Sequence, residues 1–278
     1  MNEEVTNLES RDTIIVVDDV SMSFDKDDGS SIDVLRGVSF ELKRGETVCI
    51  LGGSGGGKST LLKVMIGAYT PTKGDVRIGG ESIVGLRERA MNAVRRRFGV
   101  LFQSAALLNS MTVGENVALP LEAHTKHAVA TIEIMVRVKL QQVGLSEAQD
   151  RLPSEISGGM QKRAGLARAI ALDPEIVFYD EPSAGLDPIA TTVIDVLIND
   201  MKQKMGMTNI VVTHVMESVR RIADRIIMLD RGRVLLDGTL DDLLRSPDPR
   251  IQSFVKGETD QLVDDSKDHD RFLNDLMM

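Results

Sequence analysis

Short apolar runs recur along the chain, with helical patterns between them. Several runs are apolar at every position, which is typical of strands buried on both faces of a parallel sheet. We predict strands at TIIVV (13–17), TVCIL (47–51), FGVLF (98–102), IVFY (176–179), NIVVT (209–213) and RIIML (225–229). Because these strands alternate with helices, the pattern predicts an α/β fold with right-handed crossovers.

The clearest helical pattern covers residues 188–205. Asp187 is the expected N-cap, Pro188 takes the first helical position, and Gly206 follows the last one. Five apolar residues repeat at helical spacing inside the segment: Ile189, Val193, Ile194, Leu197 and Met201.

Two segments depart from the alternation. Residues 104–165 are mostly helical in pattern, so we expect a helical insertion inside an α/β domain that spans 12–257. From 258 to 278 the chain is polar and acidic and ends in RFLNDLMM. We expect this tail to be a partner-binding element or simply loosely ordered; as a helix it would place four apolar residues on one face, Phe272, Leu273, Leu276 and Met277.

Composition narrows the function. The net charge is -9 and aromatic residues make up 3%, so neither a basic nucleic-acid footprint nor a base-stacking platform is expected. No apolar run approaches 18 residues, and residues 1–12 lack the apolar stretch of a secretion signal. With one cysteine, Cys49, intrachain disulfides and Cys-rich metal sites are excluded. We expect a cytoplasmic protein, or one that reaches a membrane through another protein.

A glycine-rich segment supplies the first candidate chemistry. Residues 52–60 fit the P-loop pattern G-x-x-x-x-G-K-[ST], after the strand at 47–51 and before a helical run. Backbone N–H groups of such a loop surround phosphates, Lys58 should reach the β- and γ-phosphates of ATP, and the Ser59 hydroxyl should ligate Mg²⁺. The predicted nucleotide-binding residues here are Gly52, Gly53, Ser54, Gly55, Gly56, Gly57, Lys58, Ser59 and Thr60.

An acidic pair follows the predicted strand at 176–179. The carboxyl end of a neighbouring buried strand is where a second Mg²⁺ contact belongs. We predict that Asp180 acts on the metal, through water, and that Glu181 polarises the attacking water as a general base.

The string Ser157-Gly158-Gly159-Met160-Gln161 stands before a helical run and shortly before Asp180. In this order and spacing, the chain over about 14–245 resembles the ATP-binding cassette (ABC) ATPases. The resemblance implies a P-loop core with a mainly parallel sheet, an N-terminal antiparallel β region and a helical insertion. It also implies that Ser157, Gly158 and Gly159 contact the γ-phosphate of ATP held by a second copy. A helix N-terminus suits such an anion.

The resemblance assigns four further residues. Gln103 matches the Q-loop glutamine that touches Mg²⁺, and Asp187 closes the D-loop, which crosses the dimer interface. His214 matches the switch histidine beside the γ-phosphate. Phe24 stands where the family usually has the tyrosine that stacks on adenine, so the aromatic face is kept and the hydroxyl lost.

The distance between the P-loop and the signature, and the number of cassettes, indicate the kind of ABC protein. About 100 residues without sustained heptads separate the P-loop from the signature, unlike the long coiled coils of DNA-repair members, and there is one cassette, unlike ribosome-associated members. A transport ATPase is therefore favoured, acting with an integral-membrane permease on the cytoplasmic face of the inner membrane, without direct insertion into the bilayer.

Three stretches, 101–125, 152–190 and 246–258, resemble the ATPases of MCE-domain lipid transporters such as the maintenance-of-lipid-asymmetry (Mla) system. Met160 in the signature, where glutamine is commonest in the wider family, is typical of that group. The implied function is phospholipid transport with an MCE-domain protein and a possible small regulatory subunit. The alternative is an importer ATPase for a small polar solute, an amino acid or a metal.

Overall fold

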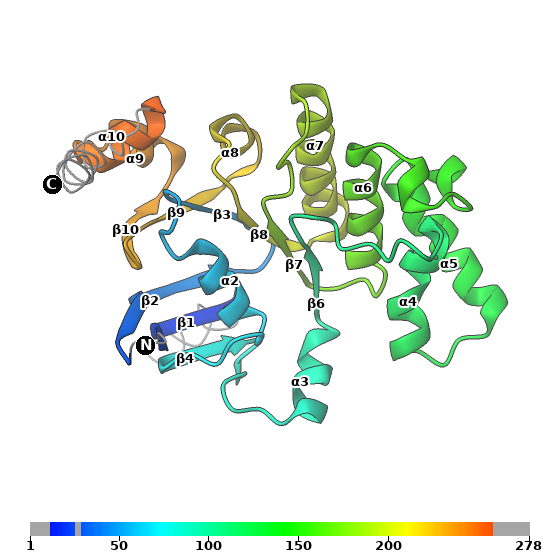
Figure 1. Ribbon diagram of the computed structural model, residues 1–278, viewed down its shortest axis with the longest axis horizontal. Coiled ribbons are helices and arrows are strands. Elements are labelled where there is room, and N and C mark those ends of the chain that lie inside the picture. The colour runs from blue at the N-terminus through cyan, green and yellow to red at the C-terminus, as the bar shows by residue number, and fades with distance from the viewer. Residues whose placement is uncertain (1–11, 26–28, 258–278) are drawn as a thin grey trace, which may run out of the picture.

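The computed structural model describes residues 12–25 and 29–257. The runs that are apolar at every position form the middle of a six-stranded sheet with the order β10-β9-β3-β8-β7-β6 (Figure 1). Every residue of β3 and β8 is buried, the polar Thr47, Thr208 and Asn209 included. The parallel strands are β3 (Thr47–Leu51), β6 (Phe98–Leu101), β7 (Ile176–Asp180), β8 (Thr208–Val212) and β9 (Arg225–Asp230), and β10 (Arg233–Gly238) joins β9 antiparallel.

The N-terminal strands form a separate antiparallel sheet, as the family resemblance implied. Its order is β2-β1-β4-β5. The run at 13–17 is a strand as predicted, but it belongs to this second sheet. Burial alternates along β2, so its polar positions hid it from a search for continuous apolar runs. The strands are β1 (Thr13–Asp25), β2 (Ser31–Lys43), β4 (Lys73–Ile78) and β5 (Glu81–Ser82).

Helices surround the two sheets and fill the predicted insertion. Between β6 and β7 the chain is helical and contains no strand, and these helices form one side of the molecule (Figure 1). The helices are α2 (Lys58–Met65), α3 (Glu88–Arg95), α4 (Val113–His124), α5 (Val129–Gln142), α6 (Gly158–Ala169), α7 (Pro188–Met205), α8 (Met216–Ile222), α9 (Leu240–Arg245) and α10 (Pro249–Lys256), with short 3₁₀ turns at Ser146–Ala148 and Pro153–Glu155. None of the helices in 12–25 and 29–257 combines the length and apolarity needed to cross a bilayer.

The ends of α7 lie where the sequence predicts. Asp187 Oδ1 accepts hydrogen bonds from the backbone N–H groups of Ile189 and Ala190, both at 2.9 Å, and Gly206 ends the helix with a φ of 67°. The apolar spacing was less informative about burial, because Ile189 is 80% exposed and Val193 is 40% exposed. The N-terminal part of this apolar stripe therefore faces outward.

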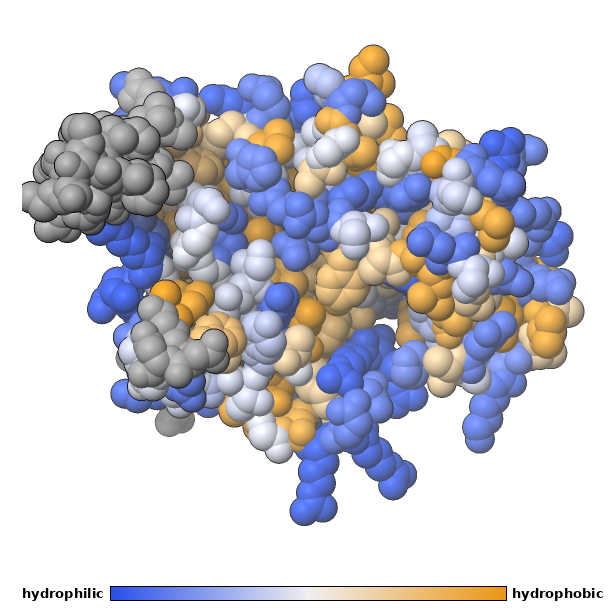
Figure 2. Space-filling view, in the orientation of Figure 1, coloured by the Kyte–Doolittle hydropathy of each residue, from blue (hydrophilic) through white to orange (hydrophobic). Residues whose placement is uncertain are grey.

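Alternation along β3 divides the interior into two cores. Val48 and Ile50 face a core shared with the antiparallel sheet and α2, whereas Cys49 and Leu51 face a core shared with the insertion and α7. Polar side chains cover most of the visible surface, with apolar side chains gathered near its middle (Figure 2). One strand thus ties the P-loop to both halves of the fold. The predicted tail, 258–278, lies outside the described residues.

The contact between β6 and α6 depends on the missing side chain of Gly99. A Cβ there would lie 2.1 Å from the backbone oxygen of Ala169. We expect Gly99→Ala to lower the free energy of unfolding by about 2–3 kcal/mol, since overpacking against backbone forces a shift. The melting temperature should fall by roughly 4–12 °C in a thermal scan. Gly53→Ala is the control, because nothing lies within 4 Å of its Cβ position; an equal loss there would contradict the steric explanation.

Candidate nucleotide-binding site

The P-loop leaves the end of β3 through backbone conformations that require glycine. Gly52 has a φ of 147°, and a Cβ there would lie 2.3 Å from the Leu229 oxygen of β9. Gly57 has a φ of 98°, and its Cβ would lie 2.9 Å from the Val34 oxygen. The loop therefore passes close to two other backbones before α2 begins at Lys58.

Lys58 lies over the loop. Its Nζ donates hydrogen bonds to the carbonyl oxygens of Gly52, at 2.8 Å, and Gly53, at 2.9 Å. Burial lowers the pKa of Lys58, while the charges of Glu181 and Asp180 oppose that shift. The ammonium group is thus close enough to the acidic pair for their charges to act on it, at the N-terminus of a helix that favours anions.

Asp180 ends β7 and Glu181 follows it. Burial raises the pKa of Asp180, and the neighbouring charge of Glu181 raises it further. Among the described residues, Asp180 Oδ1 is buried without a hydrogen-bond partner, and Glu181 Oε2 is buried 2.9 Å from Nδ1 of His214. A buried carboxylate oxygen without a partner, next to a second carboxylate, is costly, so this pair is suited to accept a cation or a proton donor.

Glu181 is held in an unusual backbone conformation. Its φ is 47°, in the left-handed region that non-glycine residues seldom adopt. Its N–H donates to the Val212 oxygen at 2.9 Å, and its carbonyl accepts from the N–H of Ala184 at 3.1 Å. Nδ1 of His214, just beyond β8, lies 2.9 Å from Oε1 of Glu181. A hydrogen bond from the imidazole to the carboxylate in this contact requires the tautomer that carries a proton on Nδ1.

The Q-loop segment reaches the same region through its backbone. Gln103 follows β6, and its side chain is exposed. Its carbonyl oxygen accepts a hydrogen bond from Nζ of Lys162 on α6, and the same Nζ lies 3.3 Å from the carbonyl oxygen of Glu181. Farther along, Arg168 donates to the carbonyls of Ala105 and Ala106, both at 2.8 Å.

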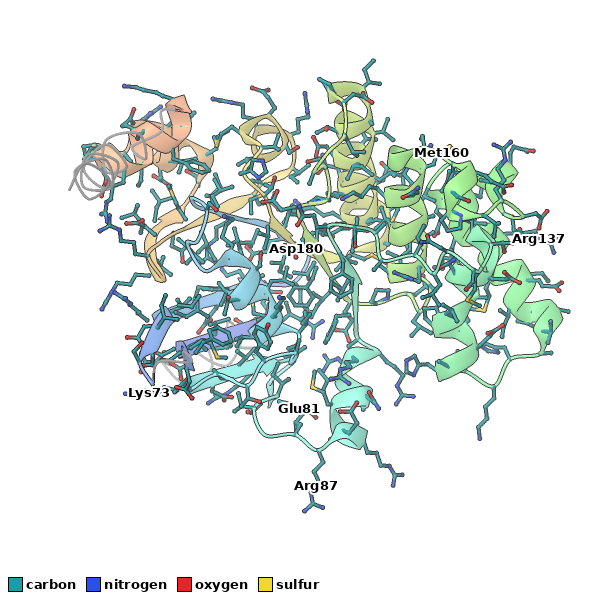
Figure 3. All side chains as sticks on the ribbon, viewed as in Figure 1. Lys73, Glu81, Arg87, Arg137, Met160 and Asp180 are labelled. Carbon is teal, nitrogen blue, oxygen red and sulfur yellow. The ribbon has the colours of Figure 1, made fainter. Side chains whose placement is uncertain are left out.

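The signature residues lie elsewhere. Ser157 is the N-cap of α6, where its Oγ accepts a hydrogen bond from the Met160 N–H at 3.3 Å. Ser157 and Gly158 are exposed, with Gly159 next to them. In Figure 3, Met160 lies apart from Asp180, at the far end of α6. The signature residues thus lie at an exposed helix N-terminus, as predicted, apart from the acidic pair of the same chain; their role as an anion site stays a prediction.

Two predicted residues are occupied by local contacts. The carboxylate of Asp187 caps α7 as described above. Phe24, in β1, packs its ring edge-on against Tyr69, with the centroids 5.6 Å apart, and Nζ of Lys63 lies 5.3 Å from the centroid of Tyr69. Among the described residues, neither Asp187 nor Phe24 forms a hydrogen bond or ring contact with Lys58, Asp180 or Glu181.

Sequence reasoning missed Lys162, Arg168 and Tyr69. The sequence did carry a signal for Lys162: its spacing from Leu166 puts both residues on one face of the helix, and in the structure that face is buried. Arg168 and Tyr69 carry no comparable pattern, since their partners are backbone oxygens about 60 residues away and the ring of Phe24 in β1.

The chain is similar to known proteins over most of its length. Residues 35–184 match the family model described as "ABC transporter". The chain is 43% identical over 223 residues to the "Intermembrane phospholipid transport system ATP-binding protein MlaF" of Haemophilus influenzae, covering 80% of this chain and 84% of that protein. It is 41% identical over 220 residues to the "Probable ribonucleotide transport ATP-binding protein mkl" of Mycobacterium leprae, spanning 79% of this chain and 63% of the relative.

A solved structure agrees in fold. The ATP-binding cassette MJ0796, in a dimeric post-hydrolysis state bound to ADP and Pi, superposes with a TM-score of 0.76 and 31% identity, covering 82% of this chain and 99% of that one. The P-loop, the acidic pair and the signature helix occur here within the same α/β cassette. The chain therefore belongs to the ABC transporter family, as an ATP-binding and ATP-hydrolysing member.

Proposed function

We propose that this chain energises phospholipid movement between membranes as the ATPase subunit of an MCE-linked ABC transporter. The observation that carries the proposal is the likeness to MlaF over most of both chains. The three stretches that resemble the MCE-linked group include the signature with Met160 and the D-loop. The first stretch includes the Q-loop, the second includes the exposed N-terminus of α6, and the third includes α10.

The residues around the acidic pair fit Mg²⁺. Ser59 is exposed at the start of α2, Gln103 is exposed after β6, and Asp180 offers an unpartnered buried oxygen. Hydroxyl, amide and carboxylate oxygens are the donors that this ion prefers. We infer that these three residues hold it together with phosphate oxygens, where it would offset the negative charge of the phosphates.

The chain's own residues supply binding and proton transfer. Lys58 exchanges its two carbonyl partners for the β- and γ-phosphates of ATP, while the N–H groups of residues 52–60 surround them. Glu181 accepts the proton of the attacking water at its carboxylate. His214 orients that carboxylate through the contact at Oε1 and lies next to the γ-phosphate.

The separation of the signature from the P-loop supports a dimer of two copies. In this arrangement Ser157, Gly158 and Gly159 of one copy close over ATP held by the other, and Asp187 lies at their interface. Phe24 offers its ring to the adenine, and the contact with Tyr69 fixes the orientation of that ring.

The permease binds beside the Q-loop. Phe102 and Leu108, on either side of Gln103 and Ala105, are large apolar side chains that are 40% and 48% exposed. We infer that the integral-membrane permease covers this segment and holds the chain at the cytoplasmic face of the inner membrane. An MCE-domain protein and a small regulatory subunit complete the proposed complex.

A second candidate is an importer ATPase for a small polar solute. The likeness to mkl favours it, because that relative is named for probable ribonucleotide transport. The ATPase site would be the same in both cases, so companions and cargo separate the two.

Glu181→Gln should bind ATP but hydrolyse it at least ~100-fold more slowly, because the general base is removed. ATP turnover of the full chain and nucleotide affinity are the measurements. Glu217→Gln, an exposed glutamate on α8, is the matched control and should keep its turnover. Near-normal hydrolysis by Glu181→Gln would exclude Glu181 as the base.

Ser157→Glu should bind ATP as a monomer yet fail to form the closed dimer, because a carboxylate would face the γ-phosphate of the other copy. Light scattering of the full chain with ATP, in the Glu181→Gln background, measures dimerisation. Ser154→Glu adds the same charge at an exposed serine three positions earlier and should dimerise normally. Equal dimerisation of both variants would contradict the trans arrangement.

Purification through a tag on this chain, from native membranes, should recover a permease, an MCE-domain protein and bound phospholipid. The chain alone should not bind liposomes, given its net charge of -9. Recovery of a soluble solute-binding protein without an MCE partner, together with ATPase activity stimulated by a small polar solute, would favour the importer instead.

A further inference from the structure

The ammonium group of Lys162 is buried where two parts of the site meet. Lys162 is 5% exposed and lies on α6, the helix that begins at the signature. Nζ donates to the carbonyl oxygen of Gln103 and lies 3.3 Å from that of Glu181. Its partners are therefore backbone atoms of two functional segments, rather than a carboxylate side chain.

Such a position is costly for a lysine. A buried ammonium is retained where hydrogen bonds and nearby negative charge compensate for lost hydration. Both are present, because burial lowers the pKa of Lys162 while the charges of Glu181 and Asp180 act in the opposite direction. The cation thus lies in the field of the acidic pair without forming an ion pair with either carboxylate.

The two segments that Lys162 contacts, around Gln103 and around Glu181, both contain backbone in the left-handed region. Glu181 has a φ of 47°, and Ala105 and Ala106, just after Gln103, have φ values of 59° and 50°. Arg168, from the same helix, donates to the carbonyls of both alanines. Non-glycine residues stay in this region only when their surroundings hold them there. Lys162 and Arg168 supply part of that hold from one rigid helix.

We propose that Lys162 is a positioning residue that fixes the backbones of Gln103 and Glu181 to α6, so that both move with the helix that carries Ser157, Gly158 and Gly159. This inference rests on the proposed role of Glu181 as the base. Displacement of α6 by a nucleotide at its N-terminus then shifts the catalytic carboxylate and the Q-loop together. Lys162 acts through Glu181 and Gln103 and does not touch the nucleotide.

The test compares Lys162→Met with Lys139→Met in the full chain. Lys139 is a matched control on α5, because it is 4% exposed and its ammonium binds Asp173, remote from the acidic pair in the contacts of the chain. Lys162→Met should lower kcat for ATP about 10–100-fold, the scale of a misplaced catalytic group, with KM changed less than about threefold. Lys139→Met should keep kcat, and Lys162→Arg should recover most of it.

A double variant identifies the route. In the Glu181→Gln background, Lys162→Met should lower the residual rate clearly less than the about 10–100-fold expected of the single variant, because the part of its effect that passes through the missing carboxylate is already lost. A kcat of Lys162→Met equal to wild type, or an undiminished further loss in the Glu181→Gln background, would overturn the inference. If Glu181→Gln hydrolyses ATP at the normal rate, Glu181 is not the general base and the proposed mechanism is wrong. That outcome is read from Glu181→Gln alone, independently of the kcat of Lys162→Met.

A purely structural lysine would give a different result. If Lys162→Met fails to fold, Lys162→Gln supplies a shorter, neutral donor that cannot reach both carbonyls, and the same loss of kcat is expected. Normal kcat in folded Lys162→Gln, or failure of both variants to fold, would assign Lys162 to stability alone and overturn the inference.

Discussion

The parallel pairing of β3, β8 and β7 brings the functional loops to one edge of the sheet. In this register Ile50 lies opposite Val212, and Val212 lies opposite Asp180. The P-loop, His214 and Glu181 follow within two residues of these three positions. Segments about 130 and 160 residues apart in sequence therefore meet because their strands end at the same level.

A buried polar network fixes that level. Tyr179 on β7 donates its hydroxyl to Asn209 Oδ1 on β8, at 3.2 Å, and the Asn209 amide reaches Thr47 Oγ1 on β3, also at 3.2 Å. A slip of one strand by a single residue would turn these side chains to the opposite face and leave buried polar atoms unpaired. The register of an otherwise apolar sheet thus gains a directional constraint.

The site combines residues at the edge of the sheet with side chains from the helices packed around it. Lys58 and Lys162 approach the acidic pair from α2 and α6, and burial lowers the pKa of both. The signature lies at the other end of its helix from the Q-loop contact made by Arg168. Association of two cassettes and the state of the acidic pair can therefore be coupled through α6, which spans the distance as a single element.

The sequence by itself determined the elements with strong local signals. The P-loop has a fixed spacing of glycine, lysine and serine, α7 has its own N-cap and terminating glycine, and the buried strands are short runs of mostly apolar residues. These features depend on backbone conformation and burial close in sequence, so they can be predicted before the fold is known.

Tertiary structure decided what depends on distant partners. The strand at 13–17 entered a separate antiparallel sheet, because pairing with β2 and β4 is non-local and β2 alternates in polarity. The contact of Phe24 with Tyr69, the outward position of Ile189 and the backbone contacts of Lys162 were likewise decided by packing between elements. A side chain's burial and hydrogen-bond partner are set by what the fold places opposite it, and local pattern does not encode that.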